Sequence, residues 1–273
     1  MKEVLQSALS ECASPISNKI IEKVEPVGGG CIHNSWHIKI KNGSDLFAKS
    51  TNYNNFDMLR FESECLKELN KFNSKKLILI PEPLAILKTK KLAILLMPWF
   101  KLINGEQALL GEGLAQLHKT SAKYNTKHFG WETNGYIGYN SQVKGWGNKW
   151  GDFFVNYRLA PQISISRKWG LDIKNLDRFL LLTTDFLNNH KPIPCLVHGD
   201  LWGGNTGVTS ESKGVIFDPA SWWGDREVDI AMTKLFGGFS KSFYLSYQKT
   251  WPLDEYSESR TEIYNLYHLL NHA

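Results

Sequence analysis

The segment Leu196–Gly207, LVHGDLWGGNTG, brings a histidine, an aspartate and an asparagine together between two strand-like runs. Buried polar groups need partners, so a cluster of this density is typical of a loop that binds a ligand. Asp200 can accept or orient the proton of an attacking hydroxyl. Asn205, five residues later, can offer a neutral oxygen to a hard cation such as Mg²⁺. His198 is expected to brace the loop by hydrogen bonds and completes the predicted catalytic pair with Asp200.

A second carboxylate, Asp218, follows the apolar run GVIF. A lone aspartate before a proline is usually a turn residue. Here it stands eighteen positions after Asp200, with about one hairpin of chain between them, so we expect it to reach the same site. Carboxylate and amide oxygens suit Mg²⁺, and Asn205 and Asp218 are therefore the predicted metal ligands.

Two further features could hold phosphate groups. Backbone amides of a glycine-rich turn can approach an anion closely. Such a turn lies between two strand-like runs and contains Gly28, Gly29 and Gly30. Lys49, at the end of the alternating run DLFAKS, can aim a positive charge into a cleft, and the helical segment that follows offers Glu62 and Glu64 as ion-pair partners.

Each of these features taken alone also fits a simpler interpretation, a turn or a set of solvated charges. Together they supply positioning, a metal clamp and an acceptor base, which are the parts that phosphoryl transfer requires. The spacing from His198 to Asn205, H-x-D-x4-N, is also that of a protein-kinase catalytic loop.

The elements that must position these residues fall into two parts. Strand-like runs over 20–27, 35–42, 45–51 and 92–100 surround a helical pattern over 56–72, and KNGS between two of the strands is a tight-turn signal. Helical patterns then dominate, over 106–121, 150–166, 176–190 and 260–272, with a short β insert that carries the polar loops. The sequence therefore predicts an α+β fold of two lobes, residues 1–99 and 100–273, with a hinge at about 97–100.

Composition excludes several classes of protein. The 273 residues are 42% hydrophobic and 22% charged, which is ordinary for a globular protein. The net charge of +5 is spread over the chain, with KTKK as the longest basic run, so no nucleic-acid partner is predicted. No window approaches the ~18 apolar residues of a membrane span. Four cysteines without paired spacing, and Glu3 and Glu11 near the N-terminus, predict a cytoplasmic protein. The oligomeric state stays open between a monomer and a homodimer.

Several motifs together resemble the fructosamine kinase family: LVHGDLWGGNTG, VIFDPASWWGDREVDIAMTKLFGGF, VGGGCIHNSW and FGW…NGYIG. These are ketosamine 3-kinases of protein-kinase-like fold, related to aminoglycoside phosphotransferases. The resemblance covers about residue 20 to the C-terminus. It implies phosphorylation of the 3-hydroxyl of a sugar joined to an amine, followed by loss of the phosphate and release of the amine. The implied cofactors are ATP and Mg²⁺, and the implied substrate is a small-molecule or protein-bound ketosamine.

The resemblance also implies roles in nucleotide binding. Lys49 corresponds to the phosphate-binding lysine, with Glu64, in preference to Glu62, as its partner. The segment Met97-Pro98-Trp99 corresponds to the hinge that meets adenine. Because proline has no N–H, adenine is expected to contact the Met97 carbonyl and the Trp99 amide.

Substrate contacts and specificity stay open. Trp202, Trp222 and Asp225 are candidate substrate contacts, although the tryptophans could fill core and the acids of DREVD could anchor the start of a helix. A small-molecule kinase of other specificity, acting on an aminoglycoside or on choline, is the alternative enzyme. A pseudokinase that only binds is the third hypothesis.

Overall fold

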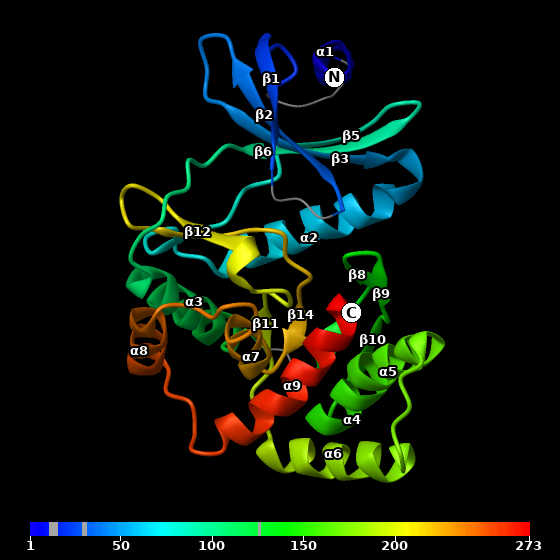
Figure 1. Cartoon of the computed structure of the whole chain (residues 1–273). Coiled ribbons are helices and arrows are strands. Elements are labelled where there is room, and N and C mark those ends of the chain that lie inside the picture. Colours follow the sequence, from blue (N-terminus) through cyan, green and yellow to red (C-terminus); the bar gives the residue numbers. More distant parts are fainter. Residues whose placement is uncertain (11–15, 29–31, 125–126) are drawn as a thin grey trace.

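The computed structural model describes residues 1–10, 16–28, 32–124 and 127–273. An antiparallel five-stranded sheet occupies the N-terminal part (Figure 1), in the order β1-β2-β3-β6-β5. Its strands are β1 Ile21–Val27, β2 Asn34–Ile40, β3 Leu46–Asn52, β5 Ala85–Lys88 and β6 Leu92–Pro98. The predicted KNGS turn joins β2 to β3, with Asn42 in the left-handed region at φ 55°. Helix α1 (Lys2–Ser10) packs on this sheet through Leu5 and Leu9, which are fully buried.

Helix α2 (Phe56–Phe72) follows β3, over the same residues that carry the predicted helical pattern. A short 3-10 turn, η1 (Tyr53–Asn55), precedes it. The buried face of α2 contains Met58, Leu59, Cys65, Leu66 and Leu69, which recur with helical spacing. Glu62 lies within this apolar face, whereas Glu64 lies outside it and is exposed.

The C-terminal part is mainly helical. Its α-helices are α3 Ala108–Ser121, α4 Trp150–Phe154, α5 Ala160–Ser166, α6 Leu176–His190, α7 Glu227–Thr233, α8 Lys241–Thr250 and α9 Ser257–His272. The helix predicted over 150–166 contains a π-helical segment, Val155–Leu159, between α4 and α5. Helix α8, which no predicted pattern covered, packs against α3 (Figure 1).

Three small sheets complete this part. One has the order β10-β7-β14-β11, a second β12-β13-β4, and a third is the β8-β9 hairpin. Their strands are β4 Ile78–Leu79, β7 Phe129–Trp131, β8 Gly135–Ile137, β9 Asn140–Gln142, β10 Gly145–Gly147, β11 Cys195–Val197, β12 Thr206–Val208, β13 Gly214–Ile216 and β14 Trp222–Gly224. Strands β11 to β14 are the predicted β insert that carries the polar loops, and β7 to β10 were not predicted.

The two parts share a core. Strand β4 precedes the proposed boundary near residue 99 but pairs in parallel with β13 of the C-terminal part. One hydrophobic cluster joins Leu66 of α2 and Leu95 of β6 to Leu114 of α3 and Leu196 of β11. The mixed α+β architecture is as predicted, and the exact domain limits stay a prediction. In the described part of the chain, no helix is long and apolar enough to cross a membrane.

Candidate active site

The loop after β11 is held by one buried carboxylate. Asp229 of α7 accepts hydrogen bonds from the backbone N–H of His198 (2.7 Å) and of Gly199 (2.8 Å). Its Oδ2 also lies 3.1 Å from Nε2 of His118. Burial raises the pKa of Asp229, but the hydrogen bond from His118 and the neighbouring imidazoles outweigh burial and leave the pKa below its usual value. Asp229, which the sequence offered only as a helix-start acid, therefore fixes the catalytic loop.

Gly199 allows the tight turn of this loop. Its φ is +85°, and a Cβ at this position would lie 2.1 Å from the carbonyl oxygen of Ala220. Both conditions exclude a side chain. The loop can therefore turn sharply between the buried strand and Asp200.

His198 braces the loop, as predicted. Its Nε2 donates to the carbonyl of Phe217 at 3.0 Å, and its Nδ1 accepts from the Asp200 N–H at 3.3 Å. This pairing requires one donor and one acceptor nitrogen, which is the neutral ring. Burial lowers the pKa of His198 more than the surrounding carboxylates raise it. His198 is thus a neutral ring whose two nitrogens both bind the backbone of the loop region.

Asp200 and Asn205 lie together as the motif spacing predicts. The amide nitrogen of Asn205 donates to the Asp200 carbonyl (2.9 Å) and to Oδ2 of its carboxylate (3.0 Å). The amide oxygen of Asn205 is left at the other end of the group. Oδ1 of Asp200 is buried without a well-formed hydrogen bond among the described residues. The Asp200 carboxylate, held by Asn205 in the motif loop, is the candidate base for a bound hydroxyl.

Lys49 of β3 has a different partner from the one predicted. Its Nζ lies 2.8 Å from Oε1 of Glu62 and 2.5 Å from Oδ1 of Asp218. Glu64 instead faces outward, with 46% of its side chain exposed and Arg60 at 3.9 Å as its ion-pair partner. The prediction of Glu64 was wrong because the apolar stripe of α2 docks on the core, and Glu62 belongs to that stripe.

The charges of this cluster influence one another. Burial lowers the pKa of Lys49, but Asp218 and Glu62 outweigh it, so the pKa is raised and the ammonium is retained. Burial raises the pKa of Glu62 to about 7 despite the opposing charge of Lys49. Burial also raises the pKa of Asp218, but Lys49 outweighs that effect and the pKa is lowered. The arrangement favours an ionised Asp218 facing a cationic lysine.

Asp218 reaches the site by an unusual backbone conformation. It follows β13 with φ of 59°, a left-handed value that non-glycine residues seldom adopt. The N–H of the preceding residue, Phe217, donates to the Asn205 carbonyl at 3.1 Å. That bond ties the Asp218 turn to the catalytic loop, so the two predicted metal ligands are held side by side.

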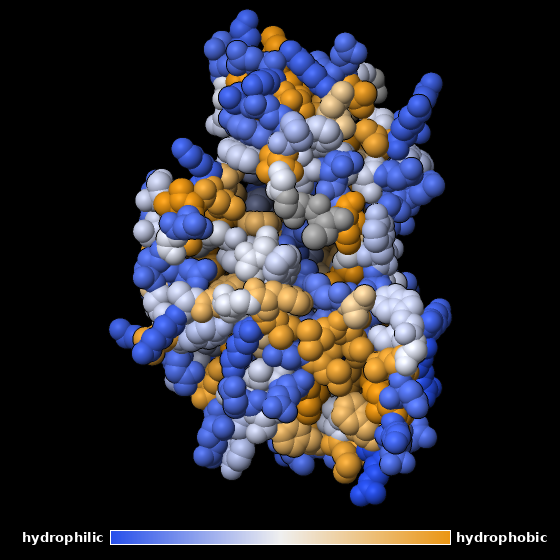
Figure 2. Space-filling model, viewed as in Figure 1, coloured by the Kyte–Doolittle hydropathy of each residue, from blue (hydrophilic) through white to orange (hydrophobic). Residues whose placement is uncertain are grey.

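Lys49, Glu62, Asn205 and Asp218 line one cavity of about 370 Å³ between the N-terminal sheet and the C-terminal part, and Asp200 lies next to it through its hydrogen bond with Asn205. Figure 2 shows a recess in this region of the surface. The residues that line the cavity include Val27, Gly28, Lys49, Glu62, Met97, Pro98, Trp99, Phe100, Gly204, Asn205 and Asp218. Gly28 has open space where a Cβ would stand. Gly29 and Gly30 lie outside the described residues.

His33, close to the glycine-rich turn, is a site residue that sequence reasoning missed. Its Nε2 is buried and lacks a hydrogen-bond partner among the described residues. Burial and the charge of Lys49 lower the pKa of His33 to about 4, against the opposing effect of Asp218. The ring is therefore neutral at pH 7 and can donate one hydrogen bond to a ligand. The histidine in VGGGCIHNSW was the available signal.

The hinge differs from expectation in its backbone contacts. The Trp99 amide donates to the Asp45 carbonyl at 3.2 Å, and Met97 pairs with Phe47 of β3. Alternate residues of a strand direct their backbone polar groups to opposite sides. Since the Leu96 carbonyl accepts from Leu84 on the β5 side, the Pro98 carbonyl points to that side too, beyond the end of β5. The backbone of Met97 and Trp99 is thus used toward β3, and Pro98 directs its carbonyl to the other side.

Of the three candidate substrate residues, one remains near the site. Trp202 is half-buried beside the catalytic loop, with its ring 5.8 Å from that of Phe236. Trp222 is core, because only 2% of it is exposed. Its ring stacks on Trp150 at 5.8 Å, and the Arg158 guanidinium lies 4.5 Å from its centre.

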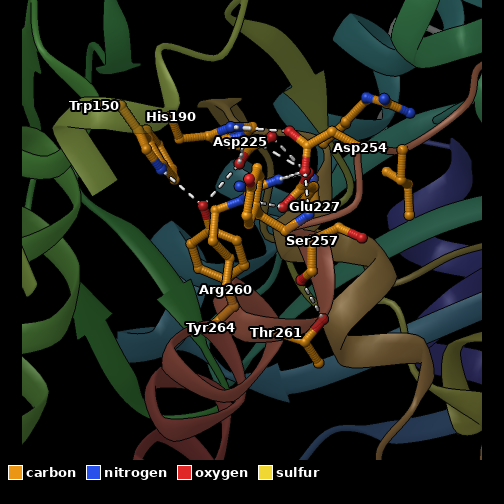
Figure 3. A network of polar contacts seen from close by, with 12 residues as sticks. Trp150, His190, Asp225, Glu227, Asp254, Ser257, Arg260, Thr261 and Tyr264 are labelled. Carbon is orange, nitrogen blue, oxygen red and sulfur yellow. Dashed lines mark hydrogen bonds and ion pairs between the residues drawn. The ribbon is translucent and has the colours of Figure 1, made fainter. Parts of the chain in front are cut away.

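Asp225 belongs to a buried network away from the cavity (Figure 3). It accepts from the Tyr264 hydroxyl at 2.7 Å and lies 3.1 Å from Nε2 of His190. Neighbouring Glu227 binds the Arg260 guanidinium through two hydrogen bonds of 2.7 Å. His190, Asp225 and Glu227 bring ligand atoms within 4.8 Å of one another, but Arg260 already supplies the positive charge. Asp225 anchors α9 and α6, and substrate contact is excluded by its burial.

Comparison with known proteins agrees with this geometry. The family model described as fructosamine kinase matches residues 4–273. A protein of Vibrio parahaemolyticus named probable ketoamine kinase is 38% identical over 259 residues, which is 93% of this chain and 87% of that protein.

Solved structures point the same way. A protein of Haemophilus somnus, provisionally named fructosamine-3-kinase, has a TM-score of 0.86 at 29% identity, covering 98% of this chain and 88% of that one. An amicoumacin kinase solved with AMP-PNP and Ca²⁺ has a TM-score of 0.59 at 14% identity, covering 98% and 83% of the two chains, and shows a shared fold.

The match to the family model spans nearly the whole chain, and the relative from Vibrio covers the catalytic loop, the lysine strand and the Asp218 turn within one long alignment. The chain belongs to the fructosamine kinase family.

Proposed function

We propose that this protein transfers the γ-phosphoryl group of ATP to the 3-hydroxyl of a ketosamine, a sugar joined to an amine by an Amadori linkage. The observation that carries the proposal is the position of Lys49 between Glu62 and Asp218, in the cavity that Asn205 also lines. A lysine fixed in this way suits the phosphates of a nucleotide. Asp200, which accepts a hydrogen bond from Asn205, is the proposed base for the acceptor hydroxyl.

The described residues fit a divalent cation, Mg²⁺ in this proposal. The amide nitrogen of Asn205 donates to Asp200, so the amide oxygen of Asn205 is available to a cation. The Asp218 side chain, which lines the cavity, is 45% exposed. Both are hard oxygen donors of the kind that Mg²⁺ prefers. When bound, the ion would neutralise charge on the β- and γ-phosphates. Asn205 and Asp218 would hold it.

The hinge supports adenine binding in this cavity. The Pro98 carbonyl can accept from an exocyclic amine, and Phe100 lines the same cavity. The Pro98 nitrogen, which carries no N–H, also faces away from β3. The proline therefore removes no hydrogen bond from the pairing of β3 with β6. The triphosphate would then extend toward Lys49 and the neutral ring of His33.

In the reaction, Asp200 accepts the proton of the sugar hydroxyl as that oxygen attacks the γ-phosphorus, and the bond from the γ-phosphorus to the bridging oxygen breaks, so that ADP leaves with the electron pair. Lys49 and His33 orient the phosphate oxygens, and Asn205 keeps the Asp200 carboxylate in place. The half-buried ring of Trp202 can pack on a sugar face. Loss of phosphate from the product would free the amine, which makes deglycation the proposed outcome.

The relatives' names support ketoamines as the substrate class. The proposal also includes a cytoplasmic location, in keeping with Cys65 and Cys195, which are buried free thiols.

The test is turnover of ATP with fructose-lysine and ribulose-lysine, compared with kanamycin and choline, with the phosphorylated carbon assigned by NMR. We expect product only from the ketosamines, with phosphate on O3. Failure to phosphorylate any ketosamine would remove the proposal, and product from kanamycin or choline would favour the alternative specificity.

The variant Asp200→Asn separates an enzyme from a binding module. We expect kcat to fall at least ~100-fold, because the general base is lost, while ATP binding by calorimetry persists. Equal ligand binding by both forms, with no turnover by the wild type, would indicate a pseudokinase.

A further inference from the structure

The last turn of α9 brings a histidine to the catalytic carboxylate. Nε2 of His272 lies 3.4 Å from Oδ1 of Asp200, the carboxylate oxygen that Asn205 does not occupy. The side chains of His272 and Asp200 are 26% and 14% exposed, so both stand at the edge of the site. No motif in the sequence connected these two residues, which are far apart along the chain.

Helix α9 is a rigid support for this contact. Tyr264 and Arg260 bind the buried carboxylates of Asp225 and Glu227 (Figure 3). One turn before His272, the Tyr267 hydroxyl donates to Gln142 at 2.8 Å. A residue on an element fixed in this way can hold another group in place.

The hydrogen bonds of the His272 ring determine which proton faces Asp200. Its Nδ1 lies 2.9 Å from the His268 carbonyl, which can only accept, so Nδ1 must carry a proton. In the neutral ring, Nε2 would then turn a lone pair toward Oδ1 of Asp200. An attractive contact with the ionised carboxylate requires the imidazolium, with a proton on each nitrogen.

The surroundings favour that imidazolium. Among the described residues, the titratable groups that face His272 are Asp200, from the catalytic loop, and His268, from its own helix. Phe236, whose ring centre lies 5.5 Å from that of His272, is uncharged. Burial lowers the pKa of His272, but Asp200 and the His268 carbonyl outweigh it, and the pKa is raised above 6.5.

We propose that His272 is a positioning residue that holds the Asp200 carboxylate in the orientation needed to meet the acceptor hydroxyl. Asn205 fixes Oδ2 and His272 fixes Oδ1, so the carboxylate is held from both sides. The distance of 3.4 Å is long for a hydrogen bond, and such catalytic contacts commonly tighten when substrate binds. The inference rests on the proposed kinase function, because Asp200 must act as the base.

Two substitutions separate positioning from support of the fold. In His272→Leu the donor is lost, and we expect kcat to fall about 10-fold, the effect of one hydrogen bond to a charged group. In His272→Gln an uncharged donor takes the place of Nε2–H, and we expect kcat within about threefold of wild type. His128→Gln, at an exposed histidine that is not among the residues lining the cavity, is the matched control and should leave turnover unchanged.

The dependence of kcat on pH distinguishes positioning from a purely structural role, because a structural role would leave it unchanged. Wild-type kcat should decline as the pH rises through the pKa of His272, which lies above 6.5, because His272 then loses the proton that faces Asp200. His272→Gln should lack this decline, because its donor does not titrate, and His128→Gln should retain it.

Wild-type turnover in His272→Leu, or the same alkaline decline in His272→Gln as in the wild type, would overturn the inference. Equal thermal midpoints would show that folding is not the cause of a loss. If the wild type itself phosphorylates no ketosamine, the proposed function has failed instead, and the two failures are distinguishable.

Discussion

Replacement of Glu62 by glutamine tests which acid of α2 serves Lys49. Nζ and Oε1 are 2.8 Å apart, and both side chains are almost fully buried, at 7% and 6% exposure. At that distance, two unit charges attract by about 6 kcal/mol at an effective dielectric constant of about 20. Burial opposes this attraction strongly enough to raise the pKa of Glu62. The expected loss is therefore taken from buried pairs that lose one partner, about 3 kcal/mol.

The expected result is a loss of about 100-fold in kcat/KM for ATP, because 2.7 kcal/mol corresponds to about two decades in rate. The assay is coupled ATP turnover at pH 8, above the raised pKa of Glu62 at about 7, so that the wild-type acid is ionised. Thermal unfolding of each variant distinguishes a misplaced lysine from a destabilised chain.

Glu64→Gln is the matched control, two residues away on the exposed side of the same helix. Its stability should stay within about 0.5 kcal/mol of wild type and its turnover should not change, because Arg60 at 3.9 Å is a weak surface partner. If Glu64→Gln loses as much activity as Glu62→Gln, or if Glu62→Gln keeps wild-type kcat/KM, the assignment of the lysine's partner is refuted.

Three other outcomes are expected. Trp222→Ala should destabilise the fold by about 3–5 kcal/mol in chemical denaturation, since it empties a core site; Trp202→Ala should instead raise KM for the ketosamine with a small change in stability, and the reverse pattern would exchange their assignments. Gly199→Ala should abolish turnover and lower the thermal midpoint, because the added Cβ meets a backbone oxygen at 2.1 Å; a wild-type midpoint would contradict the loop geometry. Burial lowers the pKa of His190, but Asp225 outweighs it and the net shift is upward. The pair therefore stabilises the fold fully below pH 6.5 and is lost as pH rises through the raised value, and His190→Gln should remove this part of the pH dependence of unfolding.

Local patterns of residues were enough to predict many of the helices and strands and the order of the chemical groups along the chain. The turn KNGS and the alternating runs fixed the strands around Lys49, and the apolar period of 56–72 fixed α2 to the residue. The motif from His198 to Asn205 placed a base and a metal ligand on one loop, because five residues of turn cannot separate them far. These are short-range consequences of backbone geometry and hydrogen bonding.

Which side chains face the cavity depends on how the helices and strands pack together. Glu62 and Glu64 stand two apart on a helix, so they point to nearly opposite sides, and the docking of the apolar stripe selects one of them. Asp225 and Trp222 turned inward because α9 and α4 cover them, although their motif reads equally well as a binding surface. His272 reaches Asp200 through the packing of a helix that is distant in sequence. Such contacts depend on how whole elements pack, and no local pattern of residues records that.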